Sequence, residues 1–264
     1  MTWVRNGSFD NNPALFCPKN LMESYEDIAS KELKAWKRDM QRKQPLLGML
    51  SRQLQARINR AIPERVHVAI TNTIKTMIRG VFTGAEFTNP SALQTDSLQE
   101  REEKVDSKIK IYARTAAAEG AATGAAGLLV GLADFPLWLT LKMKMLFEIA
   151  ALYGHNTKDI GERIYILYVF ELTFSKQGRR REIFNILKNW DAYASELPAD
   201  IDSFDWRTFQ QEYRDYIDIA KMLQLVPGIG AGVGAIVNLR LTNKLGRMAK
   251  NAYRLRRPES HSGS

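Results

Sequence analysis

The chain has 264 residues, of which 45% are hydrophobic and 25% charged, and this balance excludes an intrinsically disordered protein. Its formal net charge of +9 favours partners that carry phosphate, in lipid headgroups or in nucleic acid, although a solvated basic surface is the simpler interpretation. The single cysteine, Cys17, excludes an internal disulfide framework and fits a reducing compartment.

Positive charge is concentrated in two regions of the sequence. Residues 31–80 hold 12 Lys and Arg against 3 Asp and Glu, and residues 240–257 hold 7 basic residues and no acidic one. The remainder of the chain is therefore acidic in sum. The first residues lack the basic and then apolar order of a signal peptide, so we expect a cytoplasmic protein.

The N-terminal third predicts an irregular arm and three helices. Residues 1–22 contain two prolines and several Asn without a hydrophobic period, which is typical of an irregular arm. Apolar residues at helical spacing then predict helices over 23–43, 46–62 and 63–81. A turn-rich connection follows over 84–97.

Helices are also predicted along the rest of the chain. A long one begins near Leu98 and runs toward Gly120, and others follow over 135–153, 159–175, 179–197 and 206–225. A last helix leads from the glycines after Pro227 to about Arg256. Because no segment keeps a strand-like period of two, the predicted fold class is all-α. We expect a multi-helix bundle over residues 23–256, followed by a flexible tail at 257–264.

Two glycine-rich segments, residues 119–142 and 227–239, stand out from this pattern. Small residues four positions apart lie on one helix face and allow two backbones to approach closely. Each helical glycine costs ~1 kcal/mol relative to alanine, so tight helix packing must compensate. The predicted packing residues are Gly120, Gly124, Gly127, Gly131, Gly230, Gly234 and Asn238.

The same segments raise the question of membrane insertion. A membrane span needs about 20 mostly apolar residues, and the first segment has that length but contains Asp134 and Pro136. Much of the second segment is Gly and Ala, which insert weakly. We therefore predict a buried hairpin of two closely packed helical segments in a soluble fold. Shallow insertion and true spanning are the alternatives.

A basic amphipathic helix continues the second glycine-rich segment. Its cations are interleaved with Leu245, Met248 and Tyr253, a pattern that suits an anionic membrane surface. The alternative is an ordinary surface helix whose cations interact with its own C-terminal dipole. The candidate membrane- or anion-binding residues are Arg240, Lys244, Arg247, Lys250 and Arg254.

Carboxylates in apolar stretches form a second candidate site. If the helices bring them together, they can hold a hard cation or tune one another's pKa for acid–base work. The simpler interpretation is that Asp134 caps the helix that begins at Pro136 and that the other acids pair with nearby cations, namely Arg114, Lys144 or Arg163. The candidate metal ligands are Glu119, Asp134, Glu148 and Glu171.

No recognised catalytic or cofactor-binding motif is present. The three histidines are far apart in sequence, and HExxH, Cys–His and P-loop patterns are absent. The GIGAGVG run at residues 228–234 has no preceding strand, which argues against a dinucleotide site. The sequence therefore identifies no catalytic residue and no cofactor, and it favours a non-enzymatic role.

Three stretches of the chain resemble the EcsC family: IPERVHVAITNTIK (62–75), the segment from Gly120 to Gly154, and the segment from Asp205 to Asn238. The resemblance extends over roughly residues 23–255. Family positions matched here are Glu119, Gly120, Gly124, Asp134, Pro136, Glu148, Tyr153, Gly154, Pro227, Gly230, Gly234 and Asn238, whereas His155 replaces an expected aromatic residue. The family takes its name from an operon that also encodes an ABC transporter. The resemblance implies a bacterial, helical, membrane-associated protein with a membrane-protein partner, and it supplies no defined reaction.

These observations lead to three functional hypotheses. The first is a non-enzymatic, lipid-interacting protein attached peripherally to the inner face of the cell membrane, with anionic lipid as its partner. The second is a metal-binding protein or hydrolase that uses the carboxylates. The third is a basic nucleic-acid-binding protein. The sequence indicates no oligomeric state.

Overall fold

The computed structural model describes residues 24–42, 96–126, 135–175, 177–197 and 230–257, together with the helical positions 68, 72, 73, 76 and 80. Its helices are α1 (Tyr25–Gln41), α4 (Leu98–Ala126), α6 (Phe135–Leu152), α7 (Ile160–Phe174), α8 (Gln177–Lys188), α9 (Trp190–Ser195) and α11 (Gly230–Leu255). No strand occurs in these residues. The prediction of an all-α multi-helix bundle is confirmed.

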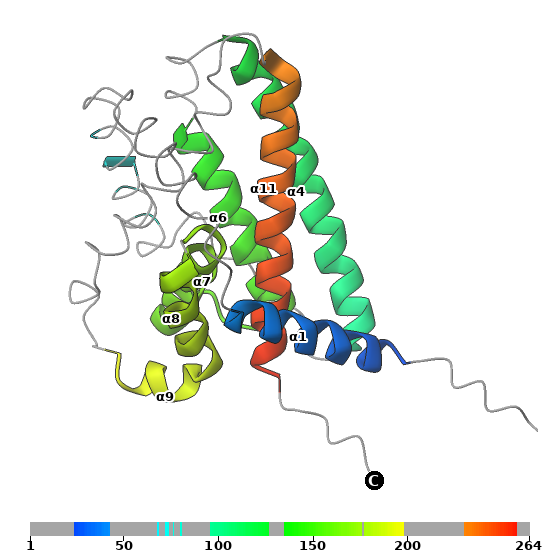
Figure 1. Ribbon diagram of the computed structural model, residues 1–264, viewed down its shortest axis with the longest axis vertical. Coiled ribbons are helices and arrows are strands. Elements are labelled where there is room, and N and C mark those ends of the chain that lie inside the picture. Colours follow the sequence, from blue (N-terminus) through cyan, green and yellow to red (C-terminus); the bar gives the residue numbers. More distant parts are fainter. Residues whose placement is uncertain are drawn as a thin grey trace, which may run out of the picture.

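Helices α4 and α11 form a long antiparallel pair, coloured teal to green and orange to red in Figure 1, and α11 also contacts α1, α6, α7 and α8. The contacts between them run in opposite directions along the two chains. Glu102 meets Arg254 near one end, Ile109 meets Gly246 midway, and Gly120 meets Gly234 toward the other end. From Glu102 to Gly120 the pair extends for about 27 Å at the usual helical rise.

The glycine-rich parts of α4 and α11 approach each other at backbone distance. A Cβ atom built on Gly120 would lie 2.5 Å from the carbonyl oxygen of Gly234 and 2.6 Å from Nδ2 of Asn238. A second close approach occurs at Gly246, where a Cβ atom would meet the side chain of Ile109 at 2.5 Å. The pair therefore packs at a separation that only glycine permits at these two positions.

Helix α6 lies beside α4 and also runs antiparallel to it. The Tyr112 hydroxyl donates to Glu148 at 2.8 Å, and the Tyr153 hydroxyl donates to Glu102 at 2.9 Å. The helix ends where Gly154 adopts a φ of +88°, with the Gly154 and His155 amides donating to the Ala151 and Ala150 carbonyls. This left-handed cap turns the chain toward α7.

Helix α7 is the most buried element, because every residue from Glu162 to Phe174 is buried. Asp159 caps its N-terminus by accepting from the Gly161 amide at 3.1 Å. An apolar surface all round indicates a helix enclosed by others, and α6, α8 and α11 pack against it. Residues of α7 therefore form much of the hydrophobic core.

Two predicted boundaries differ from the structure. The segment 179–197, predicted as one helix, is divided into α8 and α9 at Asn189, which has φ −112° and ψ 39°. Helix α4 continues past Gly120 to Ala126, and its packing on α11 compensates for the low helix propensity of glycine there.

Several sequence predictions lie outside the described residues. These are the N-terminal arm at 1–22, the helix at 46–62, most of the helix at 63–81, the helix at 206–225 and the tail at 258–264. The first glycine-rich segment is described only at its two ends, which belong to α4 and α6. No helix within the described residues combines the length and the hydropathy that a membrane crossing requires.

Helix α1 lies across the end of the α4–α11 pair that carries Glu102 (Figure 1). A capping box starts it: Ser24 accepts from the Asp27 amide, and the Asp27 carboxylate accepts from the Ser24 amide. Few of its apolar residues are fully buried, namely Ala29 and Met40. Trp36 adds an edge-on contact with Phe184, with ring centroids 5.4 Å apart. The remaining attachment of α1 is largely polar.

Candidate functional site

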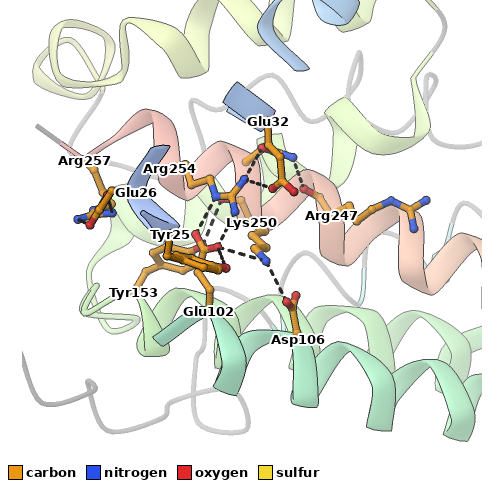
Figure 2. Close-up of polar contacts among 11 residues, drawn as sticks. Tyr25, Glu26, Glu32, Glu102, Asp106, Tyr153, Arg247, Lys250, Arg254 and Arg257 are labelled. Atoms are coloured by element: carbon orange, nitrogen blue, oxygen red, sulfur yellow. Dashed lines mark hydrogen bonds and ion pairs between the residues drawn. The ribbon is translucent and has the colours of Figure 1, made fainter. Parts of the chain in front are cut away.

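The polar centre of the described fold is a buried carboxylate, Glu102 of α4, whose side chain is 0% exposed. Arg254 donates to both of its oxygens, from Nε to Oε1 at 2.7 Å and from Nη2 to Oε2. The hydroxyls of Tyr25 and Tyr153 donate to it at 2.7 and 2.9 Å, and Lys250 Nζ lies 3.2 Å away. Figure 2 shows these groups converging from α1, α4, α11 and the end of α6. We call these five residues the Glu102 cluster.

The cluster keeps Glu102 ionised although it is buried. Burial alone would raise the pKa of its carboxyl group. Hydrogen bonds from Arg254 and Tyr25, together with the charges of Arg254 and Lys250, outweigh burial and lower the pKa from 4.5 to about 2. Burial and the nearby carboxylate raise the pKa of both tyrosines, so their hydroxyls remain donors. The arrangement is a saturated ion-pair network that joins helices.

Two more carboxylates extend this network outward. Arg254 donates from Nη1 to Glu32 of α1 at 2.7 Å, and Lys250 donates to Asp106 of α4 at 2.9 Å (Figure 2). The side chains of Glu32 and Asp106 are 57% and 46% exposed. Two cations of α11 are thus held by three carboxylates from α1 and α4.

A second buried carboxylate, Glu162 of α7, lies next to this cluster. It accepts from the Tyr253 hydroxyl at 2.7 Å and from Arg256, and His155 Nδ1 lies 3.6 Å from it. Stacking of Tyr253 on Tyr153, with ring centroids 5.3 Å apart, joins the two groups. Burial lowers the pKa of His155, although the Glu162 charge opposes this shift.

The four predicted metal ligands have different surroundings. Glu148 accepts from Tyr112 and lies 2.9 Å from Lys108 Nζ, while Glu171, fully buried, accepts from Arg179 at 2.8 Å. The carboxylate oxygens of Glu119 are buried in α4, and Asp134 lies outside the described residues. Among the residues that are described, no three His, Cys, Asp or Glu side chains form a group suited to a metal ion. A site that includes Asp134 stays an untested prediction.

The predicted basic residues of α11 do not form one exposed face. Arg240 and Arg247 are exposed, but Lys250 and Arg254 turn inward, because the buried and half-buried carboxylates of α1 and α4 require counter-charges. Lys244 is partly buried, and burial followed by the charge of Arg180 lowers its pKa to about 8. Of the five predicted anion-binding residues of α11, Arg240 and Arg247 are therefore the two that are exposed.

Neighbouring helices supply exposed cations near the glycine contact. Arg114 of α4, Lys144 of α6 and Arg240 of α11 are all exposed. We call these three residues the basic collar. A hydrogen bond of 2.6 Å from Trp138 Nε1 to Asn238 Oδ1 joins α6 to α11 at the level of Gly120. At the helical rise of ~1.5 Å per residue, the collar residues lie within about 9 Å of that level along the bundle.

Comparison with known proteins gives a consistent result. A model of the EcsC protein family matches residues 27–257. "Protein EcsC" of Bacillus subtilis (strain 168) is 40% identical over 230 residues, which cover 87% of this chain and 94% of that protein. "Uncharacterized protein YdbA" of the same organism is 32% identical over 142 residues, 54% of this chain and 52% of that protein. No solved structure matches the chain.

Proposed function

This chain belongs to the EcsC protein family, and we propose that it is a non-enzymatic protein that binds anionic lipid peripherally at the cytoplasmic face of the bacterial membrane. The observation that carries the proposal is the basic collar. Three helices present one exposed cation each at one level of the bundle, so their charges can act together on a surface of phosphate groups.

The electrostatic contribution of the collar can be given a scale. Each Lys or Arg close to an anionic membrane surface contributes about 1 kcal/mol. Three such residues give about 3 kcal/mol, which corresponds to on the order of 100-fold in affinity. The attraction weakens with salt, because the Debye length is about 10 Å at 0.1 M ionic strength.

The proposal is tested by flotation of the full chain with vesicles. We expect binding to phosphatidylglycerol vesicles at low salt, loss of binding at high salt, and little binding to phosphatidylcholine vesicles. The triple variant Arg114→Gln, Lys144→Gln and Arg240→Gln should bind phosphatidylglycerol vesicles on the order of 100-fold more weakly.

A charge-matched control separates the collar from net charge. Lys34 of α1, Lys158 before α7 and Lys188 at the end of α8 are also exposed. Their triple replacement by Gln removes the same charge away from the collar and should leave most of the binding intact. Equal losses of vesicle binding in the two triple variants would show that net charge, not the collar, causes the binding. If the unaltered protein does not float with anionic vesicles, the proposal is refuted.

A further inference from the structure

One end of the helical bundle presents no exposed charge among its described residues. The end comprises α4 from residue 115, α6 up to residue 141 and α11 up to residue 239, and it lies toward the top of Figure 1. We call it the uncharged end. Its exposed residues are Thr115, Ala118, Ala122, Pro136, Leu137, Thr140, Gly232 and Ile236. The basic collar borders it.

Two described charged residues, Glu119 within this end and Lys142 next to it, have buried charged groups. Both carboxylate oxygens of Glu119 are buried. Lys142, one residue beyond the end, is 1% exposed, and its Nζ lies 4.3 Å from the ring centre of Trp138. Burying an ion is unfavourable unless other groups compensate for its lost hydration. In the described part of this end, the fold therefore keeps these two charged groups away from the surface, where they would oppose contact with hydrocarbon.

Two large apolar side chains are left exposed here. Leu137 is 52% exposed on α6 and Ile236 is 48% exposed on α11. The bond between Trp138 and Asn238 holds these two helices together within two residues of both side chains. Moving apolar surface out of water is favourable, so transferring the exposed halves of the pair into hydrocarbon should strengthen membrane binding on the order of 30-fold.

The height of the uncharged end matches one membrane leaflet. From the collar residues to the ends of their helices there are 9 residues on α6, 10 on α11 and 12 on α4. At ~1.5 Å per residue these segments are roughly 14–18 Å long. The hydrocarbon core of a bilayer is about 30 Å thick, so one leaflet provides about 15 Å. Cations at the collar would then lie at the depth of the lipid phosphates.

We infer that the uncharged end enters the acyl region of a single anionic leaflet, with the collar at the headgroups and the Glu102 cluster pointing away from the membrane. This inference rests on the proposed function and adds the inserting surface, its depth and the orientation of the bundle. The partner is a phospholipid bilayer with anionic headgroups, because only that surface offers negative charge and hydrocarbon one above the other.

Fluorescence of a polarity-sensitive probe tests the orientation. In the full chain with Cys17→Ser, single cysteines are introduced as Leu137→Cys, Ile236→Cys and Asn156→Cys and labelled with NBD. Asn156 is exposed and follows α6 at the end opposite Leu137. With phosphatidylglycerol vesicles, the probes at 137 and 236 should brighten several-fold, shift to the blue and be quenched by nitroxide-labelled acyl chains. The probe at 156 should not change.

Flotation of the same labelled proteins keeps the two proposals distinguishable. If the proteins float but the probes at 137 and 236 remain in water, the proposed inserting surface is wrong, whereas the proposed lipid binding is still supported. Equal brightening at all three positions would overturn the orientation. Absence of flotation would overturn the proposed function, and this inference with it.

Discussion

Replacing Glu102 by glutamine is expected to lower the free energy of unfolding by about 3 kcal/mol, the low end of the 3–5 kcal/mol typical of a broken buried ion pair. The amide keeps the size of the side chain but removes the charge that balances Arg254 and Lys250. The low end of the range applies because, in the variant, Arg254 retains its ion pair with Glu32 and Lys250 retains its ion pair with Asp106. Denaturant unfolding followed by circular dichroism measures the loss.

The control for this variant acts on the same guanidinium group. Glu32 also accepts from Arg254, but its side chain is 57% exposed. Because an exposed ion pair contributes little, Glu32→Gln should cost less than about 1 kcal/mol. Equal costs for Glu32→Gln and Glu102→Gln would show that burial does not determine the strength of the cluster.

The same carboxylate makes stability depend on pH in a defined direction. Its pKa is about 2 in the folded chain and 4.5 ordinarily. A lowered folded-state pKa means that the stabilisation is complete above about pH 5 and is lost as the pH falls toward 2. At 1.36 kcal/mol per unit, the loss is about 3 kcal/mol. In Glu102→Gln this part of the acid dependence should be missing when unfolding is measured at pH 3 and pH 6.

The position of Glu102 in a periodic pattern of apolar residues indicates that its side chain is buried. Leu98, Val105, Ile109, Tyr112 and Ala116 recur on one stripe of α4 and are all buried. Glu102 occupies the remaining position of that stripe, seven residues before Ile109. The surrounding run, QEREEKVDSKIK, has the composition of a solvated segment. Composition therefore gives no indication that Glu102 faces inward. A carboxylate in an apolar stripe needs a cation from elsewhere in the fold, and sequence periodicity does not name that cation.

Local signals predicted the ends of several helices well. The predicted segment 135–153 corresponds to α6 and ends at Gly154, whose positive φ terminates the helix. The segment 159–175 corresponds to α7, which Asp159 caps. The break between α8 and α9 carries no such local signal, because Asn189 has no proline or glycine beside it to mark the change of direction. Boundaries fixed by local chemistry are therefore predictable from the sequence, whereas a break within a continuous amphipathic pattern is not.

The basic residues of α11 show where sequence reasoning reaches its limit. Helical spacing correctly placed five cations on one helix, but exposure depends on what packs beside each of them. Arg240 is exposed, and Arg254 is enclosed by acids from α1 and α4 that are more than 150 positions away in the chain. The collar combines one residue from each of three helices, so no single segment contains its pattern.

Substituting alanine for Gly120 is expected to destabilise the fold by about 2 kcal/mol, although alanine favours an isolated helix by ~1 kcal/mol. The new Cβ would lie 2.5 Å from the carbonyl oxygen of Gly234 and 2.6 Å from Nδ2 of Asn238. The first of these atoms belongs to the backbone, and the second is held by the bond between Asn238 and Trp138. Relief thus requires α4 and α11 to separate, which weakens packing along the long antiparallel pair.

Two other glycines provide a graded comparison in denaturant unfolding. A Cβ at Gly232 of α11 meets nothing within 4 Å, so Gly232→Ala should be neutral or stabilising by up to ~1 kcal/mol. At Gly246 the Cβ meets three side-chain carbons of Ile109, so Gly246→Ala should be destabilising and partly rescued by Ile109→Ala, which removes all three. No such single side-chain rescue is available at Gly120, where a carbonyl blocks the space. If Gly120→Ala unfolds at the same denaturant concentration as Gly232→Ala, the helices can separate freely, and close backbone packing is not what holds this end of the bundle together.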